Sequence, residues 1–176
     1  MTSKLKIDTL ETLDGTGTIA LNNQLSGMTT DSLPTLTAAE MPAGSVVQVQ
    51  TFTSSTNINT PLASSTVLWN MVLPLVGGGN KVNGIVNIST LMEHTGSKHF
   101  WVEDAAGAVL GAMKIKSAGQ ANWRMPATSL IFTDASPVTG SNTYTLKATS
   151  NIHLYFNYPT DYGNGVSSAQ LTEIKG

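Results

Sequence analysis

The clearest pattern along this chain is an alternation of apolar and polar side chains over residues 142–158. Side chains of a β-strand point to opposite faces in turn, so this spacing predicts two strands with one buried face each. A helix would not use this spacing. The pair Ser150 and Asn151 interrupts the run where a turn or bulge fits. The apolar positions of one parity are Tyr144, Leu146, Ala148, Ile152, Leu154, Phe156 and Tyr158.

Further strands are expected at intervals of about ten residues, the spacing typical of sandwiches and barrels. One of them, 66–76, is apolar on both parities, which indicates a central strand or a strand whose second face meets another subunit, and Pro74 places its end near an edge. A count of about nine strands without an amphipathic helix predicts an all-β, antiparallel, jelly-roll-like sandwich over 45–176. The other expected strands are 46–53, 84–92, 99–104, 108–116, 129–134 and 169–174.

Residues 1–44 differ from the rest and predict an extended N-terminal arm. Their short apolar patches cannot form a core of their own, because isolated hairpins of this size are marginal in water. The arm is either disordered in the free protein or docked on a partner, and the spaced aliphatic residues favour docking. Thr37 and Glu40 have the spacing of a capping box, which predicts one helical turn as the hinge over 37–41. The residues expected to dock are Leu5, Ile7, Leu10, Ile19 and Leu21.

The low charge of the chain limits the classes of partner that it is expected to bind. Charged residues make up 11% of the sequence, and the nine Lys and Arg residues are scattered singly, so we expect no nucleic-acid partner. A surface of Thr, Ser, Asn and small apolar residues favours packing against other chains. No apolar run reaches the ~20 residues that a membrane-spanning helix needs. Without a recognisable signal peptide, synthesis in a cytoplasm is expected.

Candidate catalytic and metal-binding residues are sparse. His94 and His99 flank a predicted turn, but neither they nor His153 match a defensible metal-ligand spacing. Glu103 and Asp104 are adjacent, so their side chains diverge in a strand, and we expect them to solvate a loop. The other carboxylates considered, Asp134, Asp161 and Glu173, are isolated in sequence. We therefore expect a non-enzymatic protein with no metal and no cofactor.

The aromatic residues offer a binding hypothesis. An aromatic face beside Asn and Asp suits a sugar, whose ring stacks while its hydroxyl groups find polar partners. The late loop 158–168 provides such a set, which makes it a candidate glycan or receptor contact. By contrast, Trp69, Trp101 and Phe156 are interpreted as core or subunit-contact residues. The candidate contact residues of the late loop are Tyr158, Asp161, Tyr162 and Asn164.

Both ends of the chain resemble structural proteins of tailed bacteriophages. The opening SKLKIDTLETLDGTGTIALNNQLSG and the junction MPAGSVV at 41–47 carry the first resemblance, and the closing SSAQLTEIKG is similar to the last strand of small phage fibre and decoration domains. The resemblance implies a virion component made in the host cytoplasm, with an N-terminal anchor on the particle and, in most such proteins, homotrimeric β-rich heads. It covers tail-fibre-like adhesins and capsid decoration proteins alike.

These observations together give a working hypothesis with alternatives. The leading one is a phage virion protein whose arm docks on capsid or tail proteins while residues 45–176 form a trimeric, fibre-like head that contacts a host-surface glycan. The first alternative is a capsid decoration protein that stabilises the phage head. The second is a free carbohydrate-binding module.

Overall fold

A computed structural model describes residues 37–61, 65–92, 97–116, 123–124, 128–150, 153–157 and 165–176. The chain divides into two units, 1–35 and 36–176, and every described residue belongs to the second. The arm residues Leu5, Ile7, Leu10, Ile19 and Leu21 therefore lie outside the described residues. The division into a 1–44 arm and a 45–176 head stays a prediction.

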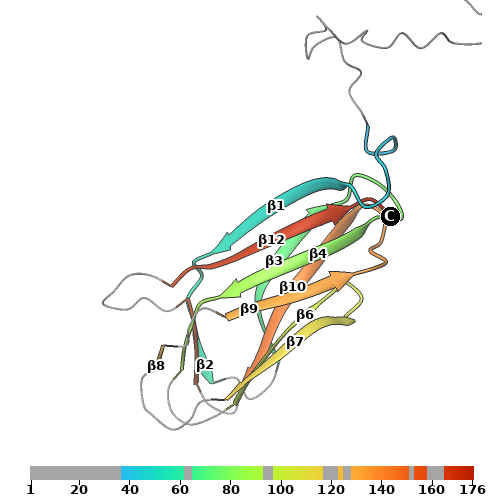
Figure 1. The fold of residues 1–176 in the computed structure, drawn as a ribbon. Helices are drawn as coiled ribbons and strands as arrows, with labels where there is room; N and C mark the ends of the chain where they lie inside the picture. The colour runs from blue at the N-terminus through green and yellow to red at the C-terminus, as the bar shows by residue number, and fades with distance from the viewer. Residues whose placement is uncertain are drawn as a thin grey trace, which may run out of the picture. The chain divides into compact units, whose positions relative to one another are not determined.

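Twelve β-strands make up the described part of the head, which contains no helix (Figure 1). Ten of the strands overlap stretches predicted from alternation; β2 and β8 were not expected. The strands are β1 (Val46–Ser54), β2 (Ile58–Pro61), β3 (Thr66–Pro74), β4 (Lys81–Ile88), β5 (Thr90–Met92), β6 (Ser97–Glu103), β7 (Val109–Lys116), β8 (Trp123–Arg124), β9 (Thr128–Asp134), β10 (Ser141–Ser150), β11 (His153–Phe156) and β12 (Ser167–Ile174).

Eight of these strands form two antiparallel four-stranded sheets, with orders β1-β12-β4-β9 and β3-β10-β6-β7. Successive long strands alternate between the sheets, except at the β6–β7 hairpin. This strand order is that of a jelly roll, in which two Greek keys wrap one core. The predicted fold class, an all-β antiparallel sandwich, is therefore confirmed.

The four remaining short strands form a third antiparallel sheet, in the order β2-β11-β5-β8. Each is part of a connection between long strands, and all four connections lie at the end of the sandwich where β1 ends and β12 begins (Figure 1). We call this the far end. The opposite end, where β1 begins and β12 ends, we call the junction end.

The core lies between the two large sheets and is built by the predicted alternation. Tyr144, Leu146 and Ala148 of β10 are fully buried, as is Phe156 of β11. The strands β4, β9 and β12 likewise alternate between buried and more exposed residues. The inward parity of residues 142–150 is thus confirmed, whereas Ile152 and Tyr158 lie outside the described residues.

Two sequence expectations need correction. Residues 66–76 do not form a central strand: β3 is the edge strand of its sheet, and its Val67 and Val72 are half exposed. Residues 84–92 do not form one strand either, because β4 and β5 belong to different sheets. The local sequence could not predict either feature, because both depend on which strands pair with β3, β4 and β5 in the folded protein.

The hinge region is a turn rather than a helix. The backbone amide of Glu40 donates to the carbonyl of Thr37 (2.9 Å), and the Glu40 carboxylate accepts from the Thr37 amide (2.7 Å). This second bond lowers the pKa of Glu40. Glu40 thus reaches back to the Thr37 backbone, as the expected capping-box spacing allows.

Candidate functional site

The junction end brings the start of the head next to the C-terminal residues. The Gly44 amide donates to the Lys175 carbonyl, and the Lys175 amide donates to the Ser45 carbonyl, both at 2.8 Å. Gly44 has φ +85°, a left-handed conformation that favours glycine. The chain therefore enters β1 through a backbone pairing with the residue that follows β12.

A fully buried carboxylate, Glu173, lies at the same end. It accepts hydrogen bonds from Gln48 Nε2 (2.6 Å), Asn80 Nδ2 (2.5 Å) and the backbone amides of Val76 and Gly77 (3.1 and 3.3 Å). Burial by itself would raise the pKa of Glu173, but these hydrogen bonds outweigh it and leave the pKa below its ordinary value. Glu173 therefore stays ionised, and its donors come from β1 and the β3–β4 loop.

An asparagine organises the far end in a similar way. Asn157 is buried and has φ +53°, a left-handed conformation that Asn tolerates better than most residues. Its Nδ2 donates to the Ser54 carbonyl at the end of β1 (2.8 Å), and its Oδ1 accepts from Ser167 Oγ at the start of β12 (2.7 Å). The Ser89 amide between β4 and β5 donates to the same Ser167 Oγ (3.0 Å). Asn157 thus ties three strand ends together.

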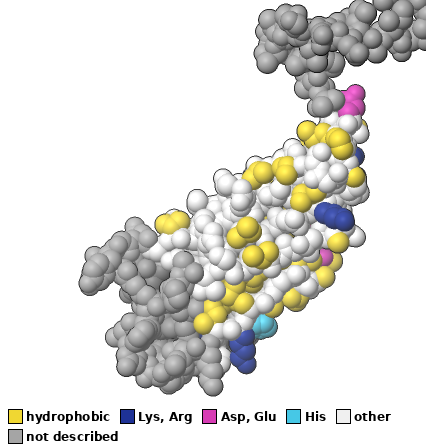
Figure 2. All heavy atoms as spheres, in the orientation of Figure 1, with side chains coloured by type: hydrophobic (Ala, Val, Ile, Leu, Met, Phe, Trp, Pro, Cys, Tyr) yellow, Lys and Arg dark blue, Asp and Glu magenta, His cyan; other side chains and the backbone are white. Residues whose placement is uncertain are grey.

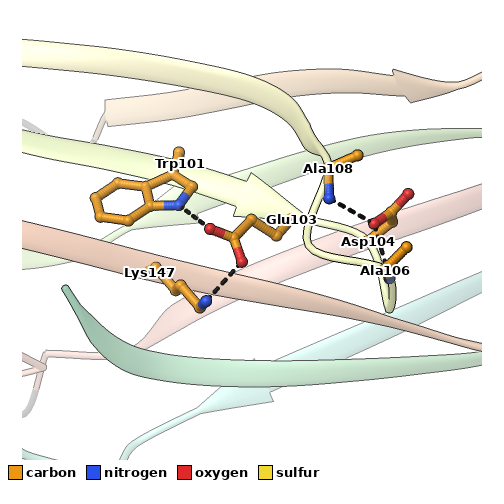
Figure 3. Close-up of polar contacts among 6 residues, drawn as sticks. All are labelled: Trp101, Glu103, Asp104, Ala106, Ala108 and Lys147. Atoms are coloured by element: carbon orange, nitrogen blue, oxygen red, sulfur yellow. Dashed lines mark hydrogen bonds and ion pairs between the residues drawn. The ribbon is translucent and has the colours of Figure 1, made fainter.

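The outer face of the β3-β10-β6-β7 sheet carries a polar and aromatic cluster. Glu103 accepts from Trp101 Nε1 (2.6 Å) and pairs with Lys147 Nζ (2.5 Å), as Figure 3 shows. The Lys147 hydrogen bond, followed by that of Trp101, lowers the pKa of Glu103. The His99 ring lies beside the Trp101 ring, with centroids 5.1 Å apart. Trp101 is only 9% exposed, so its ring is not an open platform for a sugar.

Asp104 closes the hairpin between β6 and β7. Its Oδ1 accepts from the amides of Ala106 (2.9 Å) and Ala108 (2.8 Å), which Figure 3 also shows. Gly107 completes the turn with φ +86°. The expected loop role therefore fits Asp104, but it is wrong for Glu103, which lies in β6 and bonds across the sheet.

The remaining described carboxylate that was considered, Asp134, is buried on the inner side of β9. It accepts from the Tyr144 hydroxyl (3.1 Å) and the Ser136 amide (3.0 Å). Burial, followed by the charge of Asp134, raises the pKa of Tyr144. Asp134 faces the core while Glu103 lies on an outer face, so these two carboxylates do not converge on a cleft.

Several candidate residues lie outside the part of the chain that the structure describes. These include all four proposed contact residues of the late loop and His94. His153 lies in β11, but its side chain is not described. Of the aromatic residues assigned to the core or to subunit contacts, Phe156 is fully buried and Trp69 packs against the core. The late-loop residues are Tyr158, Asp161, Tyr162 and Asn164.

Sequence reasoning missed the two organising polar residues, Glu173 and Asn157. A usable signal existed for Glu173, because it shares its parity with the buried Ala169 and Leu171. A carboxylate on an inward parity indicates a buried acceptor with several donors. Asn157 carried no such signal. One of its hydrogen-bond partners, Ser54, lies 103 residues away in the sequence, so no local pattern could reveal the contact.

The described residues contain no group of three or more His, Cys, Asp or Glu side chains that could hold a metal ion. In the same residues, no helix has the length and apolar character needed to cross a membrane.

Comparison with known proteins finds no matching family model and no matching curated protein. Solved structures with some likeness include the VP2 subviral particle of infectious bursal disease virus, at TM-score 0.26 and 13% identity over 73% of this chain. Another is a structure from the Gx strain of infectious bursal disease virus, at TM-score 0.22 and 11% identity. The chain spans 41% of the length of each of these proteins. The fold assignment therefore rests on the strand order and register of this chain.

Proposed function

We propose that this chain is a non-enzymatic structural protein of a phage virion, in which residues 1–44 dock on the particle and the β head is displayed as a trimeric, receptor-contacting module. The observation that carries the proposal is that the arm and the late loop connect to opposite ends of the head. Ser45 and Lys175 pair at the junction end, where the arm would join. Asn157 and Gly165, which flank residues 158–164, lie next to each other at the far end.

The length of β12 separates the two ends. β12 runs from Ser167, paired with Ser54, to Ile174, paired with Val46. At about 3.4 Å per residue the strand spans roughly 24 Å. A head attached through its junction end would therefore present the late loop away from the particle, as a receptor-contacting module requires.

Two further observations support a structural role over an enzymatic one. The carboxylates Glu103 and Asp134 lie on opposite sides of the β3-β10-β6-β7 sheet and both have structural partners. The buried Glu173 is likewise held by neighbouring donors. Each of these three carboxylates therefore has a role in holding the fold together.

Docking through the arm is tested by mixing the purified full chain with particles that lack it and measuring cosedimentation. We expect Leu5→Asp combined with Ile7→Asp to abolish cosedimentation. Val67→Asp is the matched control, because Val67 is 46% exposed at the start of β3, at the far end of the head. Equal binding of both variants would refute docking through the arm.

Receptor contact is tested by glycan-array binding of the full chain. Tyr162→Ala should weaken binding at least tenfold, whereas Val138→Ala, in the β9–β10 loop at the junction end, should leave it unchanged. Absence of binding to any glycan or host cell would remove the receptor role.

Capsid decoration is the second candidate, favoured by the low charge of the chain. Copy number separates the two: a decoration protein is present in hundreds of copies per particle and a fibre in few. Quantitative gel analysis of purified virions decides between them. A free carbohydrate-binding module would bind glycans equally well with residues 1–36 removed and would not cosediment with particles.

A further inference from the structure

The outer face of the β1-β12-β4-β9 sheet carries no ionisable side chain over three successive rows of its register. Each row takes one outward residue from every strand, which gives three times four positions. We call this set the uncharged face. Its rows are Thr53-Ser168-Asn87-Ser129, Thr51-Gln170-Ile85-Ile131 and Val49-Thr172-Asn83-Thr133.

This absence of charge is specific to one side of the molecule. At the 11% charged content of the whole chain, about one of these twelve positions would be charged. The outer face of the other sheet has Glu103, Lys147 and Lys114 on its strands. In Figure 2 the side that carries β1, β12, β4 and β9 shows mostly white and yellow side chains, with the charged side chains in view toward its edges.

The uncharged face carries three exposed aliphatic side chains, on β9, β4 and β1. Ile131 is 69% exposed, and Val49 and Ile85 are 49% and 41% exposed. Ile85 and Ile131 are direct cross-strand partners. Ile85 and Ile131 therefore form one exposed aliphatic patch beside the polar rows, while Val49 lies apart from them on β1.

Several polar side chains of the uncharged face are already held in place by one another. Asn87 accepts from Ser129 Oγ (2.6 Å) and donates to Ser168 Oγ (3.3 Å). Asn83 accepts from Thr133 Oγ1 (2.9 Å). Side chains fixed by their neighbours lose little conformational entropy when a partner docks.

We propose that the uncharged face is a contact surface for a second copy of this chain. A partner that brought charged side chains to this face would have to desolvate them without a counter-charge, which is costly. The same face of another copy brings none. Its hydroxyl and amide groups both donate and accept, so they can pair with those of another copy, and its exposed aliphatic side chains can pack against aliphatic side chains of that copy.

The size of the face sets the strength of this contact. Four strands about 4.8 Å apart and three rows about 6.8 Å apart give a footprint of roughly 400 Å². A stable interface buries about 800 Å² on each partner. Association in solution is therefore weak, and it becomes effective when arms hold copies close together on a particle. This last step rests on the proposed function.

The test is sedimentation velocity of the full chain up to about 1 mM, where a contact of this size becomes measurable. We expect concentration-dependent association that Ile131→Glu weakens at least tenfold. Ala112→Glu is the matched control, because Ala112 is an exposed outward residue on an edge strand of the other sheet. Monomeric behaviour over the whole range, or equal effects of the two variants, would overturn the proposal.

Cross-linking gives a second, independent readout. The chain contains no cysteine, so a single introduced one reports contact without background. Oxidation should give disulfide-linked dimers of Ile131→Cys but not of Ala112→Cys. Equal yields would overturn the proposal. Failure of arm docking with face association intact would contradict only the proposed function, and the reverse result would contradict only this inference.

Discussion

Replacing Glu173 by Gln removes the charge of the buried carboxylate while keeping its shape. The carboxylate accepts from Asn80, Gln48, Val76 and Gly77. In the variant an NH2 group replaces one carboxylate oxygen. This group is a donor, so it cannot accept the hydrogen bonds that the oxygen accepted. Buried donors are then left without a partner.

The expected cost follows from the number of donors affected. One oxygen of the variant can still serve one side of the site, so about two donors lose their acceptor, at about 1–3 kcal/mol each. Relief from burying a charge offsets about 1 kcal/mol of this loss. The free energy of unfolding should therefore fall by about 1–5 kcal/mol. For a chain of this size that lowers Tm by about 2–20 °C.

The pH dependence provides a separate signature. The pKa of Glu173 is lowered in the folded protein, so the unfolded chain binds this proton more readily. The stabilisation is therefore fully present above the ordinary carboxyl pKa of 4.5 and is lost as the pH falls through the lower folded value. The difference in stability between wild type and E173Q should shrink over that acidic window.

Urea unfolding followed by tryptophan fluorescence measures both effects. Glu103→Gln is the matched control, since its ion pair lies on an outer face and contributes less than about 1 kcal/mol. The reasoning would be refuted if E173Q were no more destabilising than E103Q at pH 7, or if its deficit were unchanged at pH 3.

Three further substitutions test other parts of the head. Gly84→Ala should lower the free energy of unfolding by about 1–3 kcal/mol in urea, because a Cβ there would lie 2.2 Å from the Phe132 ring; unchanged stability would mean that the ring moves aside freely. Asp104→Ala should cost about 1 kcal/mol in thermal unfolding, since two turn amides lose their acceptor, and an unaltered Tm would contradict this. Asn157→Ala should speed amide hydrogen exchange in β2 and β11, because the bond to the Ser54 carbonyl is lost, and uniform exchange across the head would argue against a local role.

Alternation predicted the long strands because each has one face in the core. The parity of Tyr144, Leu146 and Ala148 is a local property that burial requires, so it could be seen without any partner strand. The expected turns also appear, with Gly107 and Gly140 at positive φ between neighbouring strands. Such features depend on a few consecutive residues.

Features set by distant neighbours were not predictable in the same way. β2 and β8 have four and two residues, too few for a period to be recognised. From the sequence, Val67 and Val72 could equally have been covered by another part of the protein. In the structure β3 pairs with β10 on one side and with no strand of its sheet on the other, so both valines lie on an edge strand. The proposed late-loop and arm contacts remain predictions.

The two polar clusters are connected through one strand. Ser167, at the start of β12, accepts from Ser89 and donates to Asn157, while Glu173, near its end, binds Gln48 and Asn80. β12 also lies between β1 and β4, so both of its edges are paired along its length. A displacement of β12 along its axis would break the hydrogen bonds at both ends together. The separation between the junction end and the far end is therefore fixed by this strand, which is what a head that docks at one end and binds at the other requires.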